Sequence, residues 1–254
     1  MQLDLPAEMI LTLLLAAARA GAFLAIAPPF ASRAIPGPVK ALLSVAIALP
    51  VVSAGKGRVP GTDTASIVSA LVLQVVVGAA LGFLCLLIFS AASAAGDLLD
   101  VFGGFSLSFA LDPLMQSGNA VFGKFFQMVA TTLLLTSGGY LILLQGFLRS
   151  FDAVPLDGGL DLATLVSVLT SGVGQMLLAA LQICAPLLGV LFLADVALGL
   201  LTRVAPALNA FSLGFPFKIL LTLLLVGTTI AGLPQVVAGL ADLAGSTMVR
   251  VFEP

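Results

Sequence analysis

Residues 64–96 read TASIVSALVLQVVVGAALGFLCLLIFSAASAAG, and none of their side chains is charged. A helix of about 20 apolar residues crosses the hydrocarbon layer of a bilayer, so this stretch is more than long enough to span a membrane. A helix of this length must tilt, bend or continue beyond the hydrocarbon layer. The stretch therefore predicts a membrane helix, and the rest of the chain follows the same pattern.

Five further apolar runs lie on either side of this stretch. They cover residues 9–30, 39–54, 125–148, 162–195 and 213–241. Six runs in 254 residues leave little sequence for a soluble domain. We therefore expect one all-α, multi-pass protein of the integral-membrane type, with kinked helices and helical hairpins.

The composition excludes several classes of protein. Apolar residues make up 60% of the chain, charged residues only 9%, and the mean hydropathy is +1.22. A soluble domain carries about 25% charged residues, so this chain could not cover itself with polar surface. A net charge of −2 without a basic tract argues against a nucleic-acid partner. The absence of histidine removes His-based metal sites and Ser-His triads, so we expect no enzyme, no metal and no cofactor.

The N-terminus and the two cysteines carry simpler expectations. The first residues include Asp4 and Glu8 but no basic residue, and Arg19 interrupts the apolar run that follows. A cleaved signal peptide needs a basic start and an uninterrupted apolar core, so we expect a retained first helix. Cys85 and Cys184 lie inside apolar runs, where we expect small core residues, with a long-range disulfide as the alternative.

Prolines and small residues indicate how the helices pack. The prolines within or beside the apolar runs are Pro50, Pro186, Pro206, Pro216 and Pro234. Each removes a backbone donor and is expected to kink or break its helix, which membranes tolerate only where protein or water covers the backbone. Gly78 and Gly82 form a GxxxG pair, continued by Ala92 and Gly96, and predict close helix approach.

Four charged side chains within or beside the apolar runs need partners, because an Arg or Asp at a membrane helix centre costs roughly 2.5–3.5 kcal/mol. We expect Arg19 to pair with an Asp of another helix. Asp195 and Arg203 are roughly 80° and about 12 Å apart on one helix and cannot pair with each other. Each needs a partner elsewhere, in this chain or in another subunit. Lys218 has the same need, unless it lies at a solvated helix end.

Residues 103–113, GGFSLSFALDP, interrupt the pattern of long helices. Gly103 and Gly104 permit unusual backbone angles, and Asp112-Pro113 is a turn signal. The segment is nevertheless too apolar for an exposed loop, because it carries Phe105, Leu107, Phe109 and Leu111, with Leu114 and Met115 following. It is either a gate in a conduit or a re-entrant structural loop.

The same segment, together with residues 198–218 (LGLLTRVAPALNAFSLGFPFK), resembles the FliR family of the flagellar type III export gate, which has injectisome homologues. The resemblance covers nearly the whole chain. Residues 100–104 (DVFGG) and Ala207 depart from the family's glutamine-containing pattern. The resemblance implies a scaffold without catalysis in the bacterial inner membrane, at the flagellar basal body. Its implied partners are FliP and FliQ homologues, an FlhB-type switch protein and unfolded export substrates.

The resemblance also implies roles for parts of this chain. Residues 1–164 would be FliP-like and residues 165–254 a FliQ-like hairpin, with the loop 103–121 closing the pore. The implied pore-closing residues are Gly103, Gly104, Phe105, Leu107, Phe109, Leu111, Asp112 and Pro113. The residues implied to contact other subunits or to have a structural role are Arg19, Asp195, Arg203, Asn209, Pro216 and Lys218. Patterning alone leaves a small-solute transporter with broken helices as an alternative. The motifs favour flagellar over injectisome use.

Overall fold

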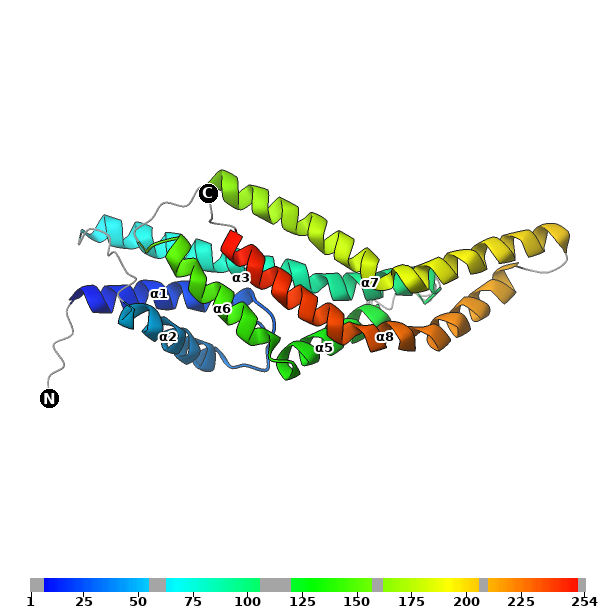
Figure 1. Cartoon of the computed structure of the whole chain (residues 1–254), viewed down its shortest axis with the longest axis horizontal. Helices are drawn as coiled ribbons and strands as arrows, with labels where there is room; N and C mark the ends of the chain where they lie inside the picture. The colour runs from blue at the N-terminus through cyan, green and yellow to red at the C-terminus, as the bar shows by residue number, and fades with distance from the viewer. Residues whose placement is uncertain (1–6, 55–62, 106–119, 157–161, 206–209, 251–254) are drawn as a thin grey trace, which may run out of the picture. The chain divides into compact units, whose positions relative to one another are not determined.

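The computed structural model describes residues 7–54, 63–105, 120–156, 162–205 and 210–250, and these residues form helices and the turns that join them. In chain order the helices are α1 (Ala7–Ile26), α2 (Gly37–Ser53), α3 (Thr64–Phe102), α5 (Val121–Thr136), α6 (Gly139–Ala153), α7 (Leu162–Val204) and α8 (Ala210–Arg250) (Figure 1). By length and composition, four of these helices could cross a membrane. If the bent pair of α5 and α6 counts as one further span, there are up to five. The expected all-α fold of the integral-membrane type is confirmed.

The pattern of the apolar run 125–148 predicts one helix, but the structure does not form one there. The run is divided between α5 and α6, which meet at an angle of 76°. Gly138 lies between them with φ +76°, in the left-handed region that glycine enters without steric cost. The local sequence Ser137-Gly138-Gly139 therefore turns the chain, although the apolar pattern continues through it.

Prolines are accommodated inside the long helices. A kink or a break is expected at each proline. The helix is not broken at Pro50 in α2, at Pro186 in α7, or at Pro216 and Pro234 in α8. Each proline removes one backbone donor, while the turns before and after it keep their own hydrogen bonds. Pro206 lies outside the described residues.

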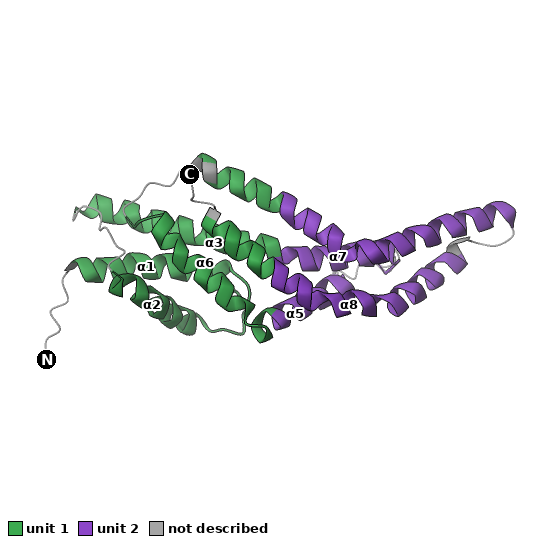
Figure 2. Cartoon of the chain, viewed as in Figure 1, with its two compact units in different colours: residues 1–88, 134–173, 240–254 green, residues 89–133, 174–239 purple. Residues whose placement is uncertain are grey.

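The chain forms two compact units, each built from separate parts of the sequence (Figure 2). Unit 1 comprises residues 1–88, 134–173 and 240–254, and unit 2 comprises residues 89–133 and 174–239. The helices α3, α5, α7 and α8 each contribute one part to unit 1 and another to unit 2. The predicted division at residue 164 concerns likeness to FliP and FliQ, which this grouping of contacts does not test.

Small residues bring helices together in both units, as the sequence predicted. In unit 1, a Cβ added at Gly78 would lie 2.1 Å from the carbonyl oxygen of Arg19, and one at Gly82 would lie 3.0 Å from that of Phe23. In unit 2, a Cβ at Gly96 would lie 2.4 Å from the carbonyl oxygen of Phe122. The backbones of α1 and α5 therefore occupy the space that a side chain on α3 would need.

Both cysteines are core residues, as expected. Cys85 and Cys184 are buried and carry free thiols. They belong to different units, Cys85 to unit 1 and Cys184 to unit 2.

Candidate functional site

The apolar loop leaves α3 through a narrow turn in unit 2. The amide of Gly103 donates to the carbonyl of Leu99 at 2.7 Å, which closes the last turn of the helix. Gly104 follows with φ +85°, a conformation that favours glycine. The two glycines therefore let the chain turn sharply away from α3.

The same turn lies against α8. A Cβ added at Gly103 would lie 2.7 Å from the hydroxyl oxygen of Thr222, and one added at Gly104 would lie 3.0 Å from the Phe215 ring. Any larger residue at either position would have to displace α8 or the turn. Close approach thus favours glycine at both positions, and the positive φ favours it at Gly104 as well.

Phe105 packs on the first turn of α5, where its ring meets that of Phe122 edge to face at 5.0 Å between centroids. Edge-to-face pairs of this kind add about 0.5–1.5 kcal/mol to the burial of the two rings. Gly103, Gly104 and Phe105 therefore form a fixed starting point for the loop. The other implied loop residues, Leu107, Phe109, Leu111, Asp112 and Pro113, lie outside the described residues.

Asp100 fixes the start of α5, where the chain resumes after the loop. Its Oδ2 accepts the amides of Phe122 at 2.9 Å and Gly123 at 3.2 Å, which are among the donors that a helix leaves unpaired in its first turn. Asp100 is only 3% exposed, and its other oxygen, Oδ1, has no hydrogen-bond partner within the described part of the chain. One helix thus supplies the cap of another, and both ends of the loop are held at the last turns of α3.

Sequence reasoning noted Asp100 only as a departure from the family pattern. A signal was nevertheless present, because Ala120, which precedes α5, has no side-chain acceptor with which to cap the helix. A carboxylate in the last turn of an apolar helix is the kind of group that could supply the missing acceptor.

Among the described residues of unit 1, Arg19 is a fully buried charge with no exposed surface. Its Nε donates to Gln74 Oε1 at 2.6 Å, its Nη1 to the carbonyl of Ser150 at 3.1 Å, and its Nη2 to the carbonyl of Val154 at 2.8 Å. The guanidinium also lies 4.2 Å from the centre of the Phe151 ring, in cation–π geometry. Gln74 in turn donates to the carbonyl of Leu156 at 3.1 Å.

The expectation that Arg19 pairs with an Asp is therefore wrong. Its partners are neutral acceptors, two of them carbonyls at the C-terminal end of α6. Carbonyls at a helix end carry the partial negative charge of that end, so a cation is stabilised there, although the Ser150 carbonyl also accepts the amide of Val154 at 2.9 Å. The arrangement ties α1, α3 and the end of α6 together.

Asp195 and Lys218 are partners of each other, although neither was expected to find one on its own segment. Lys218 Nζ lies 2.5 Å from Asp195 Oδ1, joining α7 to α8 within unit 2. The two side chains line a pocket of about 240 Å³ with Leu198, Gly199, Gly214 and Phe215. The Asp195 side chain is 44% exposed and the Lys218 side chain 17%, so the pair lies at the surface of this chain.

The remaining polar candidates are placed more simply. Arg203 is exposed in the last turn of α7, and Pro216 is exposed inside α8. Asn209 lies outside the described residues. The structure thus pairs Lys218 with Asp195, places Arg19 in the other unit, and leaves Arg203 on the surface.

The paired parts of α7 and α8 in unit 2 also present large apolar side chains on their surface. We call this the apolar hairpin surface and define it by the large apolar residues there that are each more than half exposed: Leu177, Leu178, Phe192, Leu193, Leu200, Val204, Leu220, Leu223 and Leu224. A surface of this kind marks contact with lipid or with other protein.

Comparison with known proteins identifies relatives over most of the chain. Residues 10–244 match the family described as bacterial export proteins, family 1. The chain is 30% identical over 199 residues to the flagellar biosynthetic protein FliR of Escherichia coli (strain K12), which covers 78% of this chain and 76% of that protein. It is 28% identical over 181 residues to the FliR of Bacillus subtilis (strain 168), 69% of each chain. It is 27% identical over 214 residues to the surface presentation of antigens protein SpaR of Shigella flexneri, 81% of this chain and 82% of that one.

Proposed function

Because this chain belongs to the FliR family of type III export components, we propose that it is a non-catalytic subunit of the flagellar export gate that forms the protein-conducting channel with FliP and FliQ homologues. The observation that carries the proposal is the family match over residues 10–244. The resemblance seen in the sequence is confirmed, and the chain is a multi-pass component of a type III export apparatus. We place it in the bacterial inner membrane, at the flagellar basal body.

Flagellar use is proposed over injectisome use. Two of the three relatives described above are flagellar FliR proteins, and the third, SpaR, is a surface presentation of antigens protein. An FlhB-type switch protein and unfolded flagellar subunits complete the proposed set of partners.

Within this gate, the loop that leaves α3 at Gly103 is proposed to seal the channel. Its apolar sequence suits a water-excluding plug, and its two ends are held by Gly104 against Phe215 and by Asp100 at the start of α5. A plug that must close a conduit needs fixed ends, so that its apolar side chains return to the same place. The apolar hairpin surface supports the other half of the proposal, contact with neighbouring subunits.

The seal is tested by ion conductance of the assembled complex in planar bilayers. Deletion of residues 107–111 removes Leu107, Phe109 and Leu111 but keeps Phe105, which packs on α5. The matched control deletes five residues elsewhere, the acidic segment 157–161. We expect a leak with the first deletion and none with the control, both complexes being checked for co-purification with the FliP and FliQ homologues.

Other outcomes count against the proposal. Unchanged conductance in an assembled complex refutes the seal, and a leak from both deletions refutes its assignment to this loop. If the deletion prevents assembly, the single change Phe109→Ser provides the same comparison. A chain that purifies alone when co-expressed with its proposed partners, and that transports a small solute in vesicles, would instead establish the transporter alternative.

A further inference from the structure

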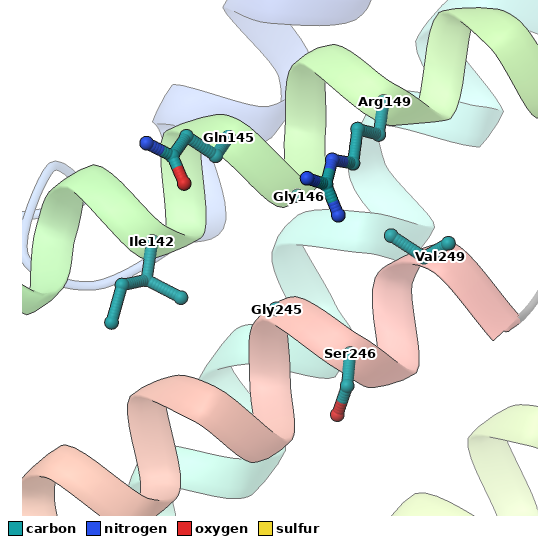
Figure 3. Close-up of a pocket in the computed structure, with 7 residues that line it drawn as sticks. All are labelled: Ile142, Gln145, Gly146, Arg149, Gly245, Ser246 and Val249. Carbon is teal, nitrogen blue, oxygen red and sulfur yellow. The ribbon is translucent and has the colours of Figure 1, made fainter.

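A groove of about 310 Å³ lies between α6 and α8 within unit 1 (Figure 3). Its polar lining consists of Gln145 and Arg149 from α6 and Ser246 from α8, and all three residues are exposed. Ile142 and Val249 supply apolar side chains. The volume falls at the lower end of the range of about 300–1,000 Å³ that is typical of ligand pockets.

Two glycines form the floor of this groove and keep it open. A Cβ added at Gly146 would lie 3.1 Å from the Cα of Gly245, so the two helices cross almost in backbone contact. A Cβ added at Gly245 would lie 2.9 Å from Ile142 Cγ2. No side chain can therefore grow from the floor, and the space between the two helix walls remains.

The lining suits a phosphate group. The guanidinium of Arg149 presents a rigid fork of donors that matches phosphate oxygens, and the Gln145 amide adds further donors. The Ser246 hydroxyl donates to the carbonyl of Leu243 at 3.0 Å and must rotate to add another. The acidic residues of the same two helices, Asp152 and Asp242, are not among the lining residues. The charge that complements the groove is therefore negative.

The position of the groove near the ends of two helices indicates which kind of molecule carries that phosphate. The apolar span of α8, Ser212–Val249, ends at the groove, and α6 ends four residues after Arg149, at Ala153. The α8 span of 38 residues is longer than the hydrocarbon layer needs, so the depth follows from the charge instead. An exposed arginine beside the ends of two apolar helices is favoured at the level of the lipid headgroups, because a charge in the hydrocarbon is costly. Ile142 lies two turns further back along α6, on the hydrocarbon side of Arg149.

We propose that this groove binds an anionic phospholipid of the phosphatidylglycerol type, with its phosphate on Arg149 and its acyl chain along Ile142. A zwitterionic phosphatidylethanolamine would bring an ammonium group toward the same guanidinium and is disfavoured. The C-terminal helix ends near the groove carry partial negative charge, which opposes an anion. At α6 this opposition is reduced, because Arg19 already binds the carbonyls of Ser150 and Val154.

The test is native mass spectrometry of the full chain released from detergent with equal amounts of dioleoyl phosphatidylglycerol and dioleoyl phosphatidylethanolamine. The variants are Arg149→Gln, which removes the charge, and Ser246→Ala, which removes one donor. The matched control is Arg33→Gln, because Arg33 is also an exposed arginine of unit 1 and lies outside the groove. One further sample replaces the lipids with inorganic phosphate.

We expect phosphatidylglycerol to bind in preference, Arg149→Gln to reduce its binding about fivefold, and Arg33→Gln to leave it unchanged. Ser246→Ala should reduce it about twofold, as befits loss of a single neutral donor. Equal loss with Arg149→Gln and Arg33→Gln would overturn the site. Equal binding of the two lipids would overturn the choice of headgroup, and tight binding of inorganic phosphate alone would overturn the assignment to a lipid.

Discussion

Replacing Arg19 by methionine should destabilise unit 1 more than any other single loss of a side-chain charge. The change keeps an unbranched apolar stem but removes donors to Gln74 and to the carbonyls of Ser150 and Val154. A buried polar group that loses its hydrogen-bond partner costs about 1–3 kcal/mol. Gln74 Oε1 and the Val154 carbonyl both lose an Arg19 donor, whereas the Ser150 carbonyl keeps the amide of Val154, so we expect a total cost of about 3–5 kcal/mol. In a chain of this size each kcal/mol lowers Tm by about 2–4 °C, so we expect a fall of about 6–20 °C.

The assay is thermal unfolding of the purified chain in mild detergent, followed by circular dichroism of the helices. Arg33→Met is the control, because Arg33 is exposed, and it should shift Tm by no more than about 1 °C. Arg19→Lys keeps the charge but lacks the planar fork, so it should give an intermediate loss. The double change Arg19→Met with Gln74→Leu should cost less than the sum of the two single changes, because it removes the orphaned amide as well. A Tm for Arg19→Met within about 2 °C of the unmodified chain would refute the reasoning.

Three further outcomes are expected. Gly78→Leu should prevent α3 from packing on α1, since even a Cβ would lie 2.1 Å from a backbone oxygen. The control Gly174→Ala, with open space around it, should leave Tm unchanged or raised. Comparable melting curves for the two variants would contradict the packing argument. Asp100→Ala should cost about 0.5–2 kcal/mol and speed hydrogen exchange at amides 122–123, and unchanged exchange would show that α5 needs no cap from α3. Lys218→Met should cost less than about 1 kcal/mol in denaturant unfolding, because its partner carboxylate is exposed, and a larger loss would show that the ion pair is more than a surface contact.

The sequence predicted the features that depend on composition and on small-residue spacing. The uncharged run 64–96 does lie in one long helix, and Gly78 and Gly82 do mark the approach of α1. The bend at Gly138 was missed because the apolar pattern continues across it. A periodicity argument registers which residues are apolar, whereas the bend depends on one positive φ angle.

Partner choice was the part that sequence reasoning could not reach. The sequence shows that Arg19 needs a partner, but backbone carbonyls at a helix end carry no residue-specific signal. Asp195 and Lys218 are 23 positions apart in the sequence, and their pairing depends on how α7 and α8 are aligned. Asp100 acts on a helix that begins 21 residues later. In each case the missing information is tertiary.

The contacts of Arg19 have a consequence for biogenesis. Its carbonyl acceptors at Ser150 and Val154 lie 131 and 135 residues further along the chain. At a synthesis rate of about 5–20 residues per second, α1 leaves the ribosome roughly 7–26 s before those acceptors exist. A newly made α1 must therefore wait with its guanidinium hydrated, at the rim of the insertion machinery or in a lipid headgroup layer, until α6 arrives. The order of translation thus delays α1 in reaching its final depth until α6 has been made, although α1 precedes α6 in the chain.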